Sequence, residues 1–225
     1  MDIPALRQRL QQASDEEQYG RALQHWLQQR SGELHRAIAL GNNGDSNLLG
    51  FVHAYIGQVP DLLEQAGEVA RNHGLSEQVL PVLRVASTFF ARPAELPAEH
   101  SGLLELLDEA YLAQRLIEEV NERYMAAGAG PLIPLNNTTA NLIVHHLLGE
   151  PFSNQLDLAV QRAVERLLPA RVFEQSAFAD YRLASASQAA RSAWASCSCL
   201  SSELGLSLRL PQCANHLPCP LDDQD

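Results

Sequence analysis

The chain has 225 residues, of which 46% are hydrophobic and 19% are charged, so its apolar content is sufficient for one core or two small ones. Its formal net charge of −11 and its pI of about 5.1 disfavour nucleic acid and anionic membrane surfaces as partners. No apolar run approaches the roughly 20 residues that cross a bilayer, and the first residues have neither a basic nor an apolar signal region, so we expect a cytoplasmic protein with no membrane partner.

Hydrophobic residues recur mainly at spacings of three and four, which is the period of amphipathic helices. We therefore predict an all-α fold, a single compact bundle or stack of about eight to ten helices over residues 1–195. An irregular tail is expected over residues 196–225. The best strand-like alternation, from Leu204 to Leu210, is short and has no evident partner run.

Capping and helix-breaking residues set the expected boundaries. Asp2 is placed to cap a first helix, and Ser14 followed by Glu17 is a capping-box pattern that predicts a second helix running to about residue 29. Ser31 predicts a short segment reaching residue 40. The remaining helices are expected at 48–56, 60–72, 77–91, 101–127, 138–148, 154–168 and 172–195, with a proline-containing loop at 92–99.

The longest predicted helix carries acids on two sides. On a helical wheel, Glu105, Asp108 and Glu119 fall opposite the apolar arc, and we expect them to face solvent. Glu118 projects into the apolar arc instead, and Glu122 lies at its rim. A carboxylate in that position is costly unless it is paired or bound to a metal. It indicates either an ion pair with an arginine or a buried acid that contacts a ligand, binds a metal or moves a proton.

The next predicted helix is apolar around almost its whole circumference and contains His145 and His146. One interpretation is two core histidines, each with a satisfied hydrogen bond. The other joins His145 or His146 with Glu118 and Glu122, and in its widest form with His53, in one interior cluster, because neutral imidazole and carboxylate groups suit metal binding or proton transfer. If the protein is an enzyme, Glu118, Glu122, His145 and His146 are its candidate catalytic residues.

All four cysteines lie near the C-terminal end, at Cys197, Cys199, Cys213 and Cys219, with His216 among them. Zinc prefers four thiolate or imidazole ligands in a tetrahedron, so these five residues are candidate zinc ligands. Such a site would order a tail that is too poor in apolar residues to fold by itself. Reduced and idle thiols, one or two disulfides, and thiol exchange are the alternatives.

The composition also excludes several enzyme classes. All 16 basic residues are arginine, so the chain has no lysine for a P-loop, a Schiff base or a kinase of the usual type. It has no G-x-G-x-x-G, G-x-S-x-G, H-E-x-x-H or E-x-x-H motif. We therefore expect a soluble, non-catalytic helical protein that binds a protein or small-molecule ligand. The alternatives are a helical enzyme that uses the Glu/His cluster and a homo-oligomer with a structural role.

Overall fold

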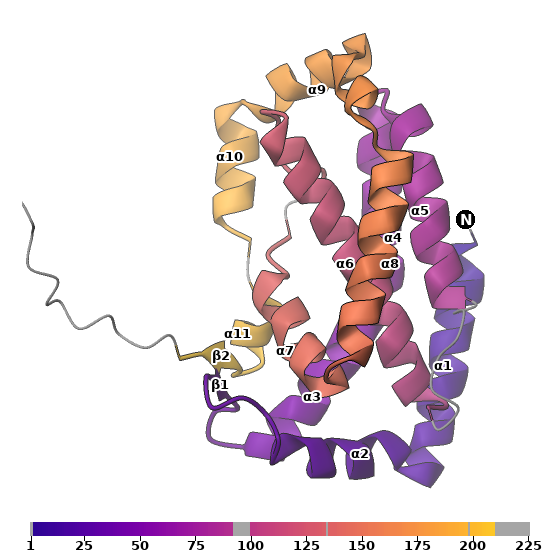
Figure 1. Ribbon diagram of the computed structural model, residues 1–225, viewed down its shortest axis with the longest axis vertical. Coiled ribbons are helices and arrows are strands. Elements are labelled where there is room, and N and C mark those ends of the chain that lie inside the picture. The colour runs from indigo at the N-terminus through magenta and orange to yellow at the C-terminus, as the bar shows by residue number, and fades with distance from the viewer. Residues whose placement is uncertain (1, 92–99, 134, 198, 210–225) are drawn as a thin grey trace, which may run out of the picture.

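The computed structural model describes residues 2–91, 100–133, 135–197 and 199–209, which fold almost entirely into helices and confirm the all-α prediction (Figure 1). None of the helices described is both long and apolar enough to cross a membrane. The elements are α1 (Ile3–Gly20), α2 (Ala22–Ser31), β1 (Ile38–Ala39), α3 (Gly44–Gly57), α4 (Val59–Asn72), α5 (Ser76–Ala91), α6 (Leu103–Ala126), α7 (Thr138–Leu148), α8 (Phe152–Leu167), η1 (Ala170–Glu174), α9 (Ser176–Ser185), α10 (Gln188–Ala195), α11 (Leu200–Glu203) and β2 (Ser207–Leu208).

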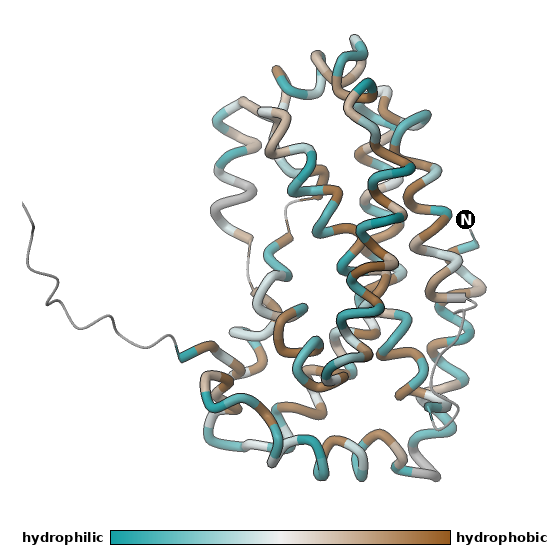
Figure 2. The backbone as a smooth tube through the Cα atoms, in the orientation of Figure 1, coloured by the Kyte–Doolittle hydropathy of each residue, from teal (hydrophilic) through white to brown (hydrophobic). Residues whose placement is uncertain are grey.

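Helix α6 is the centre of the molecule, because α1, α3, α5, α7 and α8 all pack against it. Its leucines are consequently buried on opposite sides, with Leu107 and Leu116 at 0% exposure and Leu112 at 4%. The prediction that Asp108 faces solvent is wrong for the same reason, since its side chain is fully buried. Figure 2 shows hydrophobic and hydrophilic residues alternating along the long helices, the pattern of amphipathic helices that share a core.

The predicted break before Ser14 is also wrong. Helix α1 continues through this residue, whose hydroxyl donates to a backbone carbonyl one turn earlier. The chain turns at Arg21, which has a φ of 51°, and α2 begins directly after it. The carboxylate of Glu17 accepts hydrogen bonds from the backbone N–H groups of Leu23 (3.1 Å) and Gln24 (3.2 Å). Glu17 therefore caps the start of α2 from the preceding helix.

Part of the predicted irregular tail is folded against the helical body. Strand β2 pairs antiparallel with β1, with Ile38 opposite Leu208, so the alternating run does have a partner strand. Leu206 is completely buried and belongs to the hydrophobic core. The segment after Ser31, predicted to be helical, forms turns and then β1. The packed body of the protein thus extends past residue 195.

The helices that flank the centre agree with the sequence more closely. Helix α7 covers the predicted range, and α8 begins two residues earlier than predicted, at Phe152. The last predicted helix, 172–195, is divided into η1, α9 and α10. In Figure 1, α9 crosses the top of the bundle and α10 descends beside it.

Candidate functional site

A pocket of about 340 Å³ opens where α6, α7 and α8 meet. Helix α6 contributes one face, α7 a second, and α8 contributes a single acid at the edge. We call this the acidic pocket, because three carboxylates line it against one arginine. Its lining residues are Tyr111, Arg115, Glu118, Glu122, Thr138, Asn141, Leu142, His145 and Asp157.

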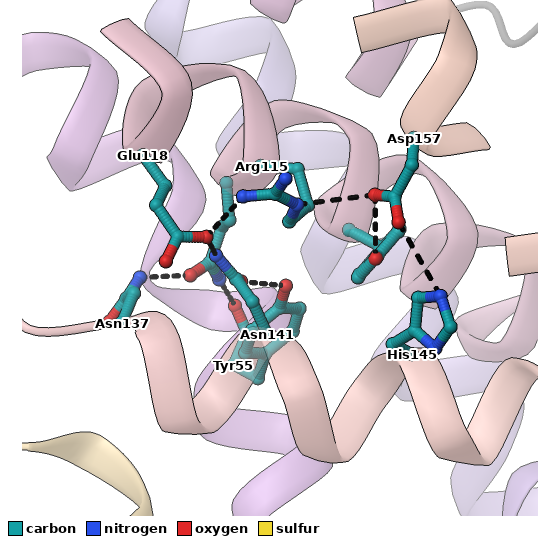
Figure 3. Close-up of polar contacts among 9 residues, drawn as sticks. Tyr55, Arg115, Glu118, Asn137, Asn141, His145 and Asp157 are labelled. Atoms are coloured by element: carbon teal, nitrogen blue, oxygen red, sulfur yellow. Dashed lines mark hydrogen bonds and ion pairs between the residues drawn. The ribbon is translucent and has the colours of Figure 1, made fainter. Parts of the chain in front are cut away.

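Arg115 lies between two of these carboxylates, as Figure 3 shows. Its guanidinium group donates to Glu118 one turn further along α6 (2.5 Å) and, through Nε, to Asp157 on α8 (3.2 Å). Two acids therefore already neutralise this cation. Because Glu122 is a third acid, the lining of the acidic pocket carries an excess of negative charge.

Glu118 is held in place from α7 as well as from its own helix. Asn141 donates through Nδ2 to a Glu118 oxygen (2.5 Å), and its Oδ1 accepts from the hydroxyl of Tyr55 (2.6 Å) (Figure 3). Burial raises the pKa of Tyr55 well above its ordinary value, so the hydroxyl stays protonated and remains a donor. This chain of hydrogen bonds satisfies a carboxylate that would otherwise be costly to place among apolar residues.

Asp157 organises the other end of the pocket. It accepts from the hydroxyl of Tyr111 (2.8 Å), and its second oxygen lies 3.4 Å from Nε2 of His145. The same His145 nitrogen lies 3.2 Å from the amide oxygen of Asn154. Burial, together with the charge of Asp157, raises the pKa of Tyr111 far above its ordinary value, so Tyr111 is a permanent donor here.

Glu122 is the exception among the three acids, since it makes no hydrogen bond or ion pair with the part of the chain that the structure describes. Partial burial raises its pKa, and the negative charges of Glu118 and Glu119 raise it further. An incoming cation would therefore relieve repulsion at this carboxylate.

A second, smaller pocket of about 160 Å³ adjoins the acidic pocket, and Glu118, Glu122 and Thr138 line both. Asn137, which is 3% exposed, lies in its wall and donates through Nδ2 to the side chain of Gln114. Its buried Oδ1 accepts no hydrogen bond from any described residue. A buried acceptor without a donor beside carboxylates favours a ligand that brings N–H groups.

The residues predicted from the sequence are only partly brought together. Glu118, Glu122 and His145 line one pocket, and the arginine partner that the sequence left open for Glu118 is Arg115. His146 is exposed and stacks on the ring of His35 at 5.7 Å. His53 lines a different pocket. The residues that sequence reasoning missed are Tyr55, Tyr111, Asn141 and Asp157.

The predicted zinc ligands fall mainly outside the described residues, which include Cys197 and Cys199 but not Cys213, His216 or Cys219. Burial raises the pKa of the Cys197 thiol. Burial also acts to raise that of Cys199, but hydrogen bonds with neighbouring serines outweigh it and the pKa is lowered. Within the described part of the chain, no group of three or more His, Cys, Asp or Glu residues is arranged to hold a metal.

The site can therefore be described as a partly open, negatively charged pocket with one carboxylate that has no partner among the described residues, beside a smaller pocket whose wall holds a buried amide oxygen without a described donor. Comparisons with protein-family models, curated proteins and solved structures find no match for this chain.

Proposed function

We propose that this protein is a non-catalytic binding protein whose acidic pocket takes a cationic group, an ammonium or guanidinium carried on a short apolar stem. The observation that carries the proposal is the charge imbalance of the pocket lining, three carboxylates to one arginine that two of them already neutralise. A cation would complete this arrangement without displacing any bond described above.

The surroundings of the pocket support the same ligand chemistry. Glu122 and the buried Oδ1 of Asn137 both lack a donor among the described residues, and an ammonium group supplies several. Leu142 is 41% exposed at the pocket wall, and Met125 is 39% exposed beside the adjoining pocket. These two side chains offer an apolar surface for the stem that carries the cation.

Both a small alkyl amine and the side chain of a partner protein present this chemistry. We retain the cytoplasmic location expected from the sequence as part of the proposal. The enzyme alternative stays a prediction. It is favoured by the contact of His145 with Asp157 inside the pocket, but the proposed function requires no proton transfer.

The test is calorimetric titration with butylammonium, using butyrate as the anion of matched length. Glu122→Gln removes one negative charge and no described hydrogen bond, so we expect it to weaken butylammonium binding about fivefold, or about 1 kcal/mol. Glu119→Gln is the control, because Glu119 pairs with Arg123 and does not line the pocket. Equal binding of butyrate and butylammonium, or equal losses in the two variants, would overturn the proposal.

A further inference from the structure

Another pocket, of about 570 Å³, lies beside the loop that follows α6 and has a different character. The end of α4, the loop at residues 130–132 and helices α9 and α10 form its walls. We call it the apolar pocket, because most of its surface is apolar and its lining includes Val69, Pro131, Leu132, Ala184 and Ala190. Its volume is within the range of small-molecule sites in proteins.

The walls of the apolar pocket are tied together by hydrogen bonds rather than loosely apposed. The hydroxyl of Tyr181 on α9 donates to the carbonyl of Pro131 (2.6 Å), and the backbone N–H of Gly130 donates to the hydroxyl of Ser185 (2.8 Å). Tyr181 is 4% exposed, and the ring of His73 packs against it edge-on with centroids 5.1 Å apart. The cavity is therefore a formed feature of the fold.

The charge of the apolar pocket is opposite to that of the molecule. No aspartate or glutamate is among its described lining residues, although the chain has 27 acidic residues and a net charge of −11. Its lining includes Arg191, and His73 lies there as well. An apolar cavity with an arginine and without an acid favours a ligand with an apolar body and an anionic end.

Arg191 is positioned to receive that anionic end. Its Nε (3.1 Å) and Nη2 (2.7 Å) both donate to the carbonyl of Ala186, which fixes the guanidinium group near the junction of α9 and α10. Its Nη1 makes no hydrogen bond with the described residues, so this donor is available to a ligand. The hydroxyl of Ser185 accepts from Gly130 and donates to a backbone carbonyl, so its donor is already used. Ser187 accepts from a backbone N–H and keeps its O–H as a neutral donor near the charged Arg191.

The geometry points to a second binding site in the apolar pocket, one that takes an amphiphilic carboxylic acid with its chain against the apolar walls and its carboxylate at Arg191. This site is independent of the acidic pocket, with which it shares no lining residue. It would allow the protein to bind ligands of opposite charge at separate places.

Titration with decanoate below its micelle concentration tests the site, with decylammonium as the chain of opposite charge and acetate as the head group alone. We expect saturable one-to-one binding of decanoate in the apolar pocket and no binding of acetate there. Decylammonium bound in the acidic pocket should be insensitive to Ala190→Leu. Ala190→Leu fills the cavity, and Arg191→Gln removes the cation, so each is expected to weaken decanoate binding about tenfold or more. Ala189→Leu and Arg182→Gln are matched controls, because both residues are exposed and neither lines the pocket.

Arg191→Gln also removes the hydrogen bonds to the Ala186 carbonyl and could loosen α10. Ala190→Leu removes no side-chain hydrogen bond, so it tests occupation of the apolar pocket independently. The inference would be overturned by absence of saturable decanoate binding or by unchanged decanoate binding in Ala190→Leu. Decylammonium binding that Ala190→Leu weakens as much as decanoate binding would overturn it too. Retention of decanoate binding by Glu122→Gln is expected, because that residue belongs to the other pocket.

Discussion

Glu122 is the carboxylate whose ionisation the ligand should sense most strongly. Its pKa is raised by partial burial and by the charges of Glu118 and Glu119, so it takes up a proton at a higher pH than an ordinary glutamate. A cationic ligand favours the ionised form. Affinity for butylammonium should therefore increase as pH rises through the raised pKa of Glu122 and then level off.

Calorimetric titration across the acid range measures this dependence. His145 on α7 and Asp157 on α8 also face the pocket. Protonation of either side chain weakens the binding of a cation, which is the same direction of change as protonation of Glu122. We therefore expect Glu122→Gln to reduce the slope rather than remove it. An identical pH dependence in the variant and the parent protein would contradict the assignment of Glu122.

Another acid on α6, Glu109, lies in the core and is held by a partly exposed arginine. Its side chain is fully buried and forms a two-pronged ion pair with Arg9 of α1. Burial raises the pKa of Glu109 to about 8, although Arg9 acts to lower it. A pKa raised by folding gives stability that is present at low pH and is lost as pH rises through the folded value. Removing Arg9 should increase the stability that is lost as pH rises.

We expect Arg9→Met to lower the free energy of unfolding by about 3 kcal/mol near pH 8, because it leaves a buried acid without its counter-charge. Near pH 5, where Glu109 can be buried protonated, the loss should be clearly smaller. Urea unfolding at the two pH values measures both. Arg7→Met is the control, since Arg7 pairs with Asp61 and Glu64 at the surface, and its unfolding midpoint should barely move.

Among single residues, Glu118 could be predicted as a site residue because it interrupts an apolar arc, whereas Asp157 has no such signal in the sequence. Asp157 lies on an ordinary amphipathic helix, and its contacts with Tyr111 and Arg115 span more than 40 positions of the chain. Periodicity along one helix carries no information about which other helix faces it. The acidic pocket could be predicted in part, therefore, but its third acid and its donors could not.

Among the elements, the junction of α1 and α2 depends on one side chain from outside the second helix. Glu17 accepts from two of the first N–H groups of α2, which have no partner within their own helix. Glu17→Ala should lower the free energy of unfolding by about 1 kcal/mol, as the loss of a helix cap does elsewhere. Urea denaturation measures it, with the neighbouring exposed residue in Glu16→Ala as control. A loss in the control equal to that in the variant would show that Glu17 does not act as a cap.

The same junction explains why the sequence prediction failed there. Ser14 and Glu17 have the spacing of a capping box, but Glu17 uses its carboxylate seven residues later and Ser14 bonds within α1. The prediction for helix α6 failed for a different reason. A helical wheel with one apolar side assumes that the opposite side faces water. With helices packed on several sides, both Asp108 and Leu112 are buried.

For the whole molecule, the sequence predicted the fold class from spacing alone, because long amphipathic helices can pack only by sharing a core. It could not predict the pairing of β1 with β2, since Ile38 and Leu208 are far apart in the chain and each strand has only two residues. That pairing holds residues 207–208 against β1. Segment 200–208 consequently belongs to the packed body rather than to an independent extension.

The predicted zinc site is tested by measuring the metal content of the whole protein. Elemental analysis of protein purified without added metal should find close to one equivalent of zinc if Cys197, Cys199, Cys213, His216 and Cys219 supply the ligands. Cys213→Ser should then lower the zinc content, because a tetrahedral site loses a thiolate. Less than about a tenth of an equivalent in the parent protein would contradict the zinc prediction.

The proposed function requires that a cation enters the acidic pocket. Nuclear Overhauser contacts between bound butylammonium and the protein locate the bound cation most directly. The ligand methylenes should give cross-peaks to the methyl groups of Leu142 and Thr138, which line that pocket. Cross-peaks confined to other parts of the protein, or none at ligand saturation, would contradict the account.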